Sequence, residues 1–311
     1  MHVILLGPQR LQPILNQAVA DVDRKVGARG HLAVVTAGWE EREVEIQELD
    51  EHVGGRARNL EIYHRVEDIF AKDAELLVAM RQRHDALREL QELYRVRLLH
   101  QMAAVTELAA RSGRVDLRQA AERAALGAVR ALDAEHLEAA QHIHDDFERR
   151  YVPGERPHVQ RHKREIAQVL QQCSILCIAG GHVGVLLHRL RLFDVLGLHG
   201  KRPIIAWSAG AMVCTERVVL FHDSPPQGQG HAEAYELGFG CIPGVLALPH
   251  ARRRLKLDDP QRVARLAQRF APLHAVALDE RTRVDWDGKR LTVQQGTRAL
   301  HADGSVREGA A

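Results

Sequence analysis

Five short apolar segments constrain the fold of this chain most strongly. Each is bounded by Gly, Pro or polar residues and is followed by a stretch with helical character; they cover residues 2–7, 31–38, 59–63, 174–181 and 203–210. Strands that are apolar on both faces occur in parallel sheets covered by helices on both sides. The sequence therefore predicts an α/β fold with a mostly parallel sheet, and a working site at the carboxyl ends of its strands.

A long helical segment interrupts this alternation. Neither Gly nor Pro occurs from Arg56 to Ser112, and apolar residues recur there at helical spacing: Leu87, Leu90, Tyr94, Leu98, Met102, Val105 and Leu108. A turn at 111–113 precedes a second, Ala-rich helical stretch from about 116 to 150, and the Pro/Gly link 152–157 follows it. We interpret 66–152 as a helical hairpin inserted into an α/β domain formed by 1–65 and 153–311.

The remainder of the chain predicts further strands and a helix. Segments 217–221 and 244–248 are strand-like, and 259–270 is an amphipathic helix. Residues 275–296 alternate apolar and polar side chains around an Asp287-Gly288 turn, which is typical of antiparallel strands that complete a sheet.

Composition excludes several classes of function. The chain carries 43 Lys and Arg against 41 Asp and Glu, a formal charge of +2, which indicates neither a nucleic-acid partner nor an anionic membrane surface. The four cysteines lack metal-site spacing and are expected to be reduced core thiols of a cytoplasmic protein. The apolar run at the start is too short for a signal segment, and no run is long enough to span a membrane. We expect no metal and no cofactor.

The corner Ala206-Trp207-Ser208-Ala209-Gly210 carries the strongest chemical signal. It matches the nucleophile-elbow pattern G-x-S-x-G, with Ala206 in place of the first Gly. Small residues flank such a serine because the turn from strand to helix is tight. A serine in a small-residue corner can equally be a helix N-cap.

A serine hydroxyl needs a histidine to take its proton and a carboxylate to orient that histidine. Asp223 and His250 each follow a strand-like segment, so we expect both at the edge where Ser208 lies. His222 is an alternative base, but Asp223 cannot easily orient its own sequence neighbour toward the serine.

These residues resemble the serine peptidases typified by dipeptidase E and cyanophycinase, which are built on the flavodoxin-like fold of the class I glutamine amidotransferases. The resemblance covers roughly 1–65 and 153–300 and is carried by four motifs: CIAGGHVGVLLHRL (177–190), AWSAGAMV (206–213), HDSPP (222–226) and LPHARRRL (248–255). It implies a serine hydrolase that cleaves peptide or amide bonds of small peptides through an acyl-enzyme.

The resemblance also implies roles for single residues. Ser208 is the nucleophile, His250 the general base and Asp223 the orienting acid, while the backbone N–H groups of Gly181 and Ala209 form the oxyanion hole. The residues expected to contact substrate are Gly180, His182, Trp207, Arg252 and Arg254. His182 replaces the Asn or Asp usual in the family, so the substrate preference of the known members does not carry over, and the arginines can equally form a solvated helix start.

Other candidates have plainer interpretations. Relatives with a cysteine nucleophile need that thiolate at the elbow, whereas Cys214 lies six residues later and is expected in the core. Polar residues of the second hairpin helix are interpreted as a solvated surface rather than a metal site, although Glu138 and His142 have i,i+4 spacing; they are Glu135, Glu138, His142, His144, Asp145 and Asp146. Trp39 can line the cleft or belong to the core.

The hairpin leaves two roles open. It can restrict access to short substrates as a lid, or join two chains in a homodimer, and its apolar seam favours the dimer because such a stripe needs burial. The alternative to a hydrolase is a non-catalytic binding or scaffold protein that keeps the fold and recognises a partner through the hairpin.

Overall fold

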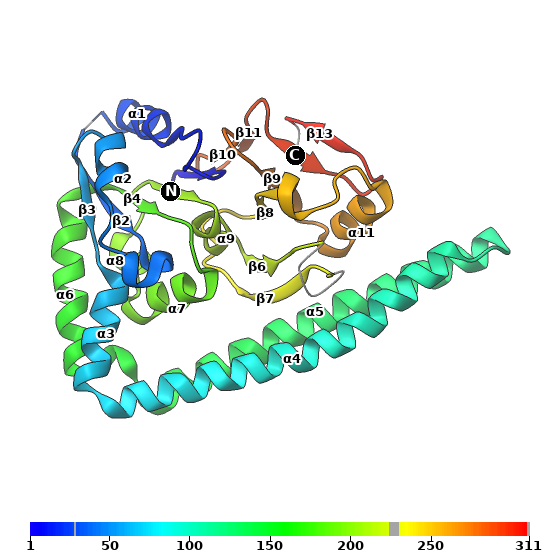
Figure 1. Ribbon diagram of the computed structural model, residues 1–311, viewed down its shortest axis with the longest axis horizontal. Helices are drawn as coiled ribbons and strands as arrows, with labels where there is room; N and C mark the ends of the chain where they lie inside the picture. The colour runs from blue at the N-terminus through cyan, green and yellow to red at the C-terminus, as the bar shows by residue number, and fades with distance from the viewer. Residues whose placement is uncertain (28, 224–229, 310–311) are drawn as a thin grey trace.

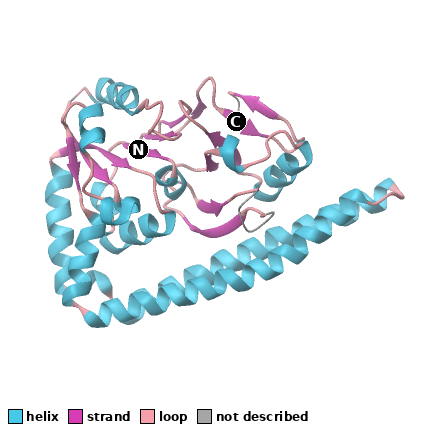
Figure 2. Cartoon of the chain, in the orientation of Figure 1, coloured by secondary structure: helices cyan, strands magenta, loops and turns pink. Residues whose placement is uncertain are grey.

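A seven-stranded mixed sheet lies at the centre of the computed structural model, which describes residues 1–27, 29–223 and 230–309 (Figures 1 and 2). Its order is β11-β10-β1-β5-β4-β2-β3. The strands are β1 (Val3–Leu6), β2 (His31–Val35), β3 (Ala57–Asn59), β4 (Cys173–Ile178), β5 (Ile204–Trp207), β10 (Arg283–Trp286) and β11 (Leu291–Val293). Neighbouring strands among β1, β5, β4, β2 and β3 pair in parallel, whereas β10 pairs antiparallel with β1 and β11 pairs antiparallel with β10. The predicted mostly parallel sheet is therefore confirmed.

Helices cover both faces of this sheet. α1 (Leu15–Val26) and α2 (Gln47–His52) pack on the face that contains Ile4 and Leu6. The opposite face, which contains Val3 and Leu5, is covered by α3 (Ile62–Lys72), α6 (Pro157–Gln171), α7 (Val183–Phe193) and α8 (Val195–His199). β1, β4 and β5 are buried almost throughout because both of their faces meet helices, which is the physical reason for their apolar sequences.

A second sheet of order β13-β12-β9-β8 lies beside the first. Its strands are β8 (Val245–Pro249), β9 (His274–Leu278), β12 (Arg298–Leu300) and β13 (Val306–Glu308), with α10 (Ala251–Arg254) and α11 (Pro260–Phe270) between β8 and β9. β6 (Arg217–Leu220) and β7 (Glu233–Leu237) form a separate antiparallel ribbon. The strands predicted within 275–296 are thus divided: β10 and β11 complete the central sheet, while β9 pairs in parallel with β8.

The third predicted strand differs from the structure. β3 ends at Asn59, and Glu61 adopts the left-handed region (φ 50°) just before α3. The buried carboxylate of Glu43 accepts the N–H groups of Tyr63 and His64, which begins the helix where the apolar pattern suggested a strand.

Residues 74–151 contain a pair of long antiparallel helices, α4 (Ala74–Ala110) and α5 (Val115–Tyr151), that runs along the body and extends beyond it (Figure 1). The predicted hairpin segment 66–152 thus begins within α3, whose Val66 and Ile69 are buried in the core of the body. The short 3₁₀ helix η2 (Pro153–Glu155) follows α5, and another, η1 (Ala37–Arg42), follows β2. Four seam residues of α4 are buried in one apolar cluster with residues of α5 and β7, namely Tyr94, Leu98, Met102 and Val105, and Leu87 is also buried. Most of the seam that suggested a dimerisation arm is thus buried within the chain, whereas Leu90 and Leu108 are half-buried.

Two further expectations concern the whole chain. All four cysteines are buried and free of disulfide bonds. Within the described residues, no helix combines the length and the apolar character needed to cross a bilayer.

Candidate active site

Ser208 lies at a sharp corner between β5 and α9 (Ala209–Cys214). Its backbone has φ 52° and ψ −121°, a region that non-glycine residues rarely adopt. The corner is packed closely against the turn that follows β4: a Cβ atom at position 180 would lie only 2.7 Å from Ser208 Cβ, so Gly180 is required there. The side chain of Ser208 makes no N-cap hydrogen bond to α9. Ser208 is therefore not a capping serine, and its corner has the sharp backbone turn that the predicted nucleophile elbow requires.

His250 is the basic group next to this serine. It follows β8, and its Nε2 lies 3.5 Å from Ser208 Oγ, at the outer limit of a hydrogen bond. Burial and the neighbouring Arg254 lower the pKa of His250, which keeps the imidazole neutral and able to accept a proton at neutral pH. The alternative base, His222, lies on the wall of the same cleft.

Asp223 is not brought to His250. One of its carboxylate oxygens accepts from Arg262 Nη2 at 2.5 Å and the other from the backbone N–H of Lys256 at 2.7 Å. The Asp223 N–H donates to the carbonyl of Arg254 at 2.7 Å. The residue fastens the loop after β6 to the segment after α10, which is a structural position rather than that of an acid oriented on a histidine.

Two other carboxylates lie beside His250. β8 pairs with β9 so that Pro249 is opposite Leu278, and the next residues along β9 are Asp279 and Glu280. Burial dominates the pKa of His250, but the charges of Glu280 and Asp279 act against it and raise that pKa. Asp279 already accepts from the Arg252 N–H at 2.9 Å and from Arg298 Nη2 at 3.1 Å.

Glu280 is exposed and forms no ion pair with any side chain in the described part of the chain. Sequence reasoning missed this residue. The signal available was an acidic pair at the end of the apolar run AVAL (275–278).

The predicted oxyanion donors face the same corner. Gly181 has φ 119°, and a Cβ there would lie 2.1 Å from the carbonyl oxygen of Gly38, so only glycine fits this turn. Ala209 begins α9, where helical N–H groups lack intrahelical partners. Neither the Gly181 nor the Ala209 N–H donates a backbone hydrogen bond to another described residue. Both are therefore free to stabilise a negative oxygen near Ser208.

Ser208 and His250 open onto a cleft of about 1630 Å³ at the carboxyl ends of the parallel strands. Trp39, Trp207 and Arg254 line it, as expected. Two predicted substrate contacts, His182 and Arg252, are not among the residues that line it. His182 caps α7 by accepting the Val185 N–H on Nδ1 at 3.2 Å, and the side chain of Arg252 is 68% exposed outside the cleft.

No protein-family model matches this sequence, and no curated protein matches it. The chain is similar to a peptidase from an acI-B1 Actinobacterium, known from a crystal structure. The likeness has a TM-score of 0.47 and 13% sequence identity, and covers 99% of this chain and 96% of that one.

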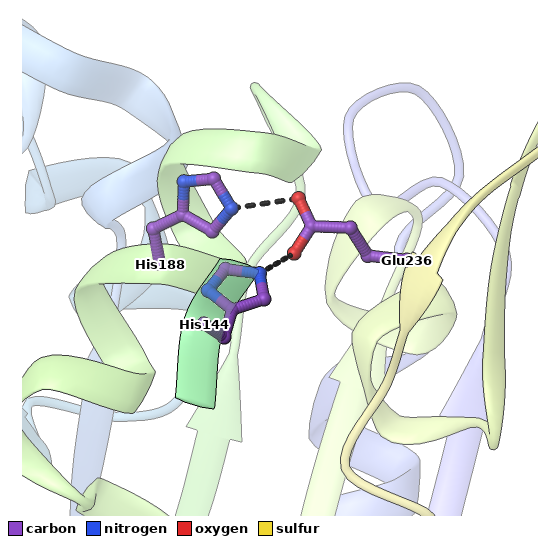
Figure 3. A group of neighbouring side chains, drawn as sticks. All are labelled: His144, His188 and Glu236. Atoms are coloured by element: carbon purple, nitrogen blue, oxygen red, sulfur yellow. Dashed lines mark hydrogen bonds and ion pairs between the residues drawn. The ribbon is translucent and has the colours of Figure 1, made fainter. Parts of the chain in front are cut away.

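The predicted polar surface of α5 is only partly as expected. Glu138 and His142 are exposed, but His144 is buried and its Nε2 lies 2.6 Å from Glu236 Oε2. His188 lies on the other oxygen of the same carboxylate, with Nε2 2.7 Å from Oε1 (Figure 3). Sequence reasoning missed this group because its three members come from three elements far apart in the chain.

Proposed function

We propose that this protein is a serine hydrolase that cleaves peptide or amide bonds of small peptides, on a flavodoxin-like fold of the class I glutamine amidotransferase type. One observation carries the proposal: a strained corner brings Ser208 Oγ to within 3.5 Å of His250 Nε2 in the lining of a cleft. The proposal rests on this geometry and on the motif resemblance.

The chemistry follows from these positions. His250 takes the Oγ proton as Ser208 attacks the substrate carbonyl carbon, and the resulting oxyanion accepts the N–H groups of Gly181 and Ala209. His250 then gives the proton to the leaving amine as the C–N bond breaks, which leaves an acyl-enzyme on Ser208. Water, deprotonated by His250, hydrolyses that ester and restores the serine.

A carboxylate must orient the imidazole and stabilise its charged form. We assign this role to Glu280 rather than Asp223, because both Asp223 oxygens are used by Arg262 and Lys256 whereas Glu280 has no such partner in the described part of the chain. Glu280 acts through His250 and does not itself touch substrate.

The walls of the cleft fit a short peptide. Trp39 and Trp207 supply apolar surface, and Arg254 supplies a cation that forms no ion pair with described side chains. A carbonyl or carboxylate oxygen of the substrate would accept hydrogen bonds from the guanidinium N–H groups of Arg254.

A fluorophosphonate probe tests the proposal directly, since it reacts only with an activated serine. Wild-type protein should be labelled, Ser208→Ala should not, and His250→Ala should be labelled at least about 100-fold more slowly. Ser174→Ala, which removes a hydroxyl bonded to the His31 carbonyl, is the matched control and should be labelled as wild type. Folded wild-type protein that stays unlabelled would favour the non-catalytic binding protein. Screening short peptides, with Ser208→Ala as blank, then identifies the substrate.

A further inference from the structure

Three buried side chains converge where the hairpin meets the body. His144 comes from α5, His188 from α7 and Glu236 from β7, and Figure 3 shows both imidazoles aimed at the one carboxylate. Their ligand atoms lie within 4.8 Å of one another, and the side chains are 7%, 12% and 2% exposed. The two imidazole rings are 5.5 Å apart with planes inclined by 69°.

We propose that His144, His188 and Glu236 bind a divalent transition metal ion of the Zn²⁺ type, which fastens the helical hairpin to the body. Two imidazole nitrogens and one carboxylate oxygen are a ligand set that such ions favour. The site is separate from Ser208 and takes no part in the proposed hydrolysis.

To admit the ion, the three ligand atoms, now within 4.8 Å of one another, must move to the spacing of a metal site. Metal–ligand bonds of about 2.0–2.1 Å at tetrahedral angles place ligand atoms about 3.3 Å apart. The imidazole nitrogens now lie 2.6 and 2.7 Å from the carboxylate oxygens, as N–H donors. On binding, each imidazole moves its proton from Nε2 to Nδ1 and turns the Nε2 lone pair to the ion, and no proton need be released.

Neighbouring charges set the kind of ion. Arg191 Nη1 lies 3.0 Å from Glu236 Oε2 and can hold that oxygen while Oε1 binds the metal. The guanidinium of Arg83, stacked on Phe147 at 4.3 Å, is also close enough to act electrostatically on Glu236. Two nearby cations disfavour ions held by charge alone, such as Ca²⁺ and Mg²⁺, and leave those that gain strong bonds to imidazole.

Metal binding to purified wild-type protein tests the proposal after treatment with a chelator. Titration with Zn²⁺ should show one saturable site that Ca²⁺ and Mg²⁺ do not compete for, and Zn²⁺ should raise the thermal midpoint by about 4 °C at 100-fold excess over Kd. Co²⁺ should give visible absorption bands characteristic of a low-coordinate nitrogen and oxygen site.

Two variants locate the site. His144→Ala should weaken Zn²⁺ binding by about 100-fold or more. His142→Ala, which removes an exposed histidine from the same helix, should bind as wild type. If His144→Ala is unstable, two other measurements test the site. His188→Ala should also weaken Zn²⁺ binding by about 100-fold or more, and wild-type protein should show the Co²⁺ absorption bands. Absence of a saturable Zn²⁺ site, or unchanged affinity when His144 or His188 is removed, would show that the three side chains form only a hydrogen-bonded cluster.

Discussion

Strain at single residues marks the centre of the cleft. Ser208 and His250 both have positive φ angles, 52° and 57°, although neither is glycine. Such conformations cost on the order of 1–3 kcal/mol each and persist only where surrounding packing imposes them. Here the close approach of Gly180 to Ser208 and the hydrogen bond from the His250 N–H to the Leu278 carbonyl impose them. The side chains of Ser208 and His250 are thus positioned, each at the end of a strand of its own sheet, by the backbone rather than by their own contacts.

The orienting acid gives a prediction at this scale. Glu280→Gln should slow fluorophosphonate labelling of Ser208 by about 100-fold or more, since an amide cannot stabilise the imidazolium. Asp223→Asn should label within a few-fold of wild type, because its charge is used by Arg262, although its stability should fall. Initial labelling rates of the two folded variants decide between them. A slow Asp223→Asn together with a normal Glu280→Gln would restore the assignment made from sequence.

At the residue scale, the sequence was informative for Ser208 and His250 but not for the acid. Ser208 and His250 could be located because each stands in a local motif directly after an apolar strand. The acid that we propose, Glu280, could not, because its place near His250 depends on β8 pairing with β9, a contact between segments about 30 residues apart that no local pattern records. Asp223 follows a strand too, but that strand, β6, pairs with β7 outside the sheet that carries His250.

At the scale of elements, the hairpin is joined to the body by a buried ionic network. Arg269 of α11 donates to both carboxylate oxygens of Asp133 on α5, at 2.7 and 2.6 Å, and to the hydroxyl of Tyr94 on α4 at 2.8 Å. That hydroxyl donates to Asp133 at 2.8 Å and accepts the Ala234 N–H of β7 at 3.0 Å. Every group of the network is partnered, which is the condition for a buried charge to be tolerated.

Removing one partner should therefore be costly. Asp133→Asn leaves the buried Arg269 guanidinium without its counter-charge and should lower the free energy of unfolding by about 3 kcal/mol. The matched control is Glu135→Gln on the same helix, which breaks the ion pair of Glu135 with Arg97, whose side chains are 61% and 51% exposed; it should cost less than about 1 kcal/mol. Urea unfolding of both variants measures this difference. Equal losses would mean that the network does not join the hairpin to the body.

The sequence indicated both hairpin helices closely, since Gly and Pro are absent from α4 and the turn after Ala110 is marked by Ser112 and Gly113. It did not indicate what covers them. A stripe of Leu, Tyr and Met has the same sequence pattern whether it packs on a second chain or on the next helix of its own chain. Only tertiary packing distinguishes these two contacts.

For the whole molecule, the outer end of the hairpin stands apart from the body (Figure 1). No residue from 106 to 128 is buried, and ion pairs there, such as Arg111 with Glu107 and Arg118 with Glu122, stay within the hairpin. Such a segment contributes little to the stability of the body, since most helical stability in proteins comes from packed apolar faces.

Replacing residues 108–121 with a short Gly-Ser loop should accordingly change the free energy of unfolding by less than about 1 kcal/mol and leave Ser208 labelling unchanged. Because the seam of α4 is covered by α5, we expect light scattering to give the mass of one chain, 34.8 kDa, for the full-length protein, with no change in oligomeric state on truncation. A dimer of the full chain that becomes a monomer on truncation would instead identify the outer hairpin, with its exposed Val115 and Leu117, as a dimerisation arm.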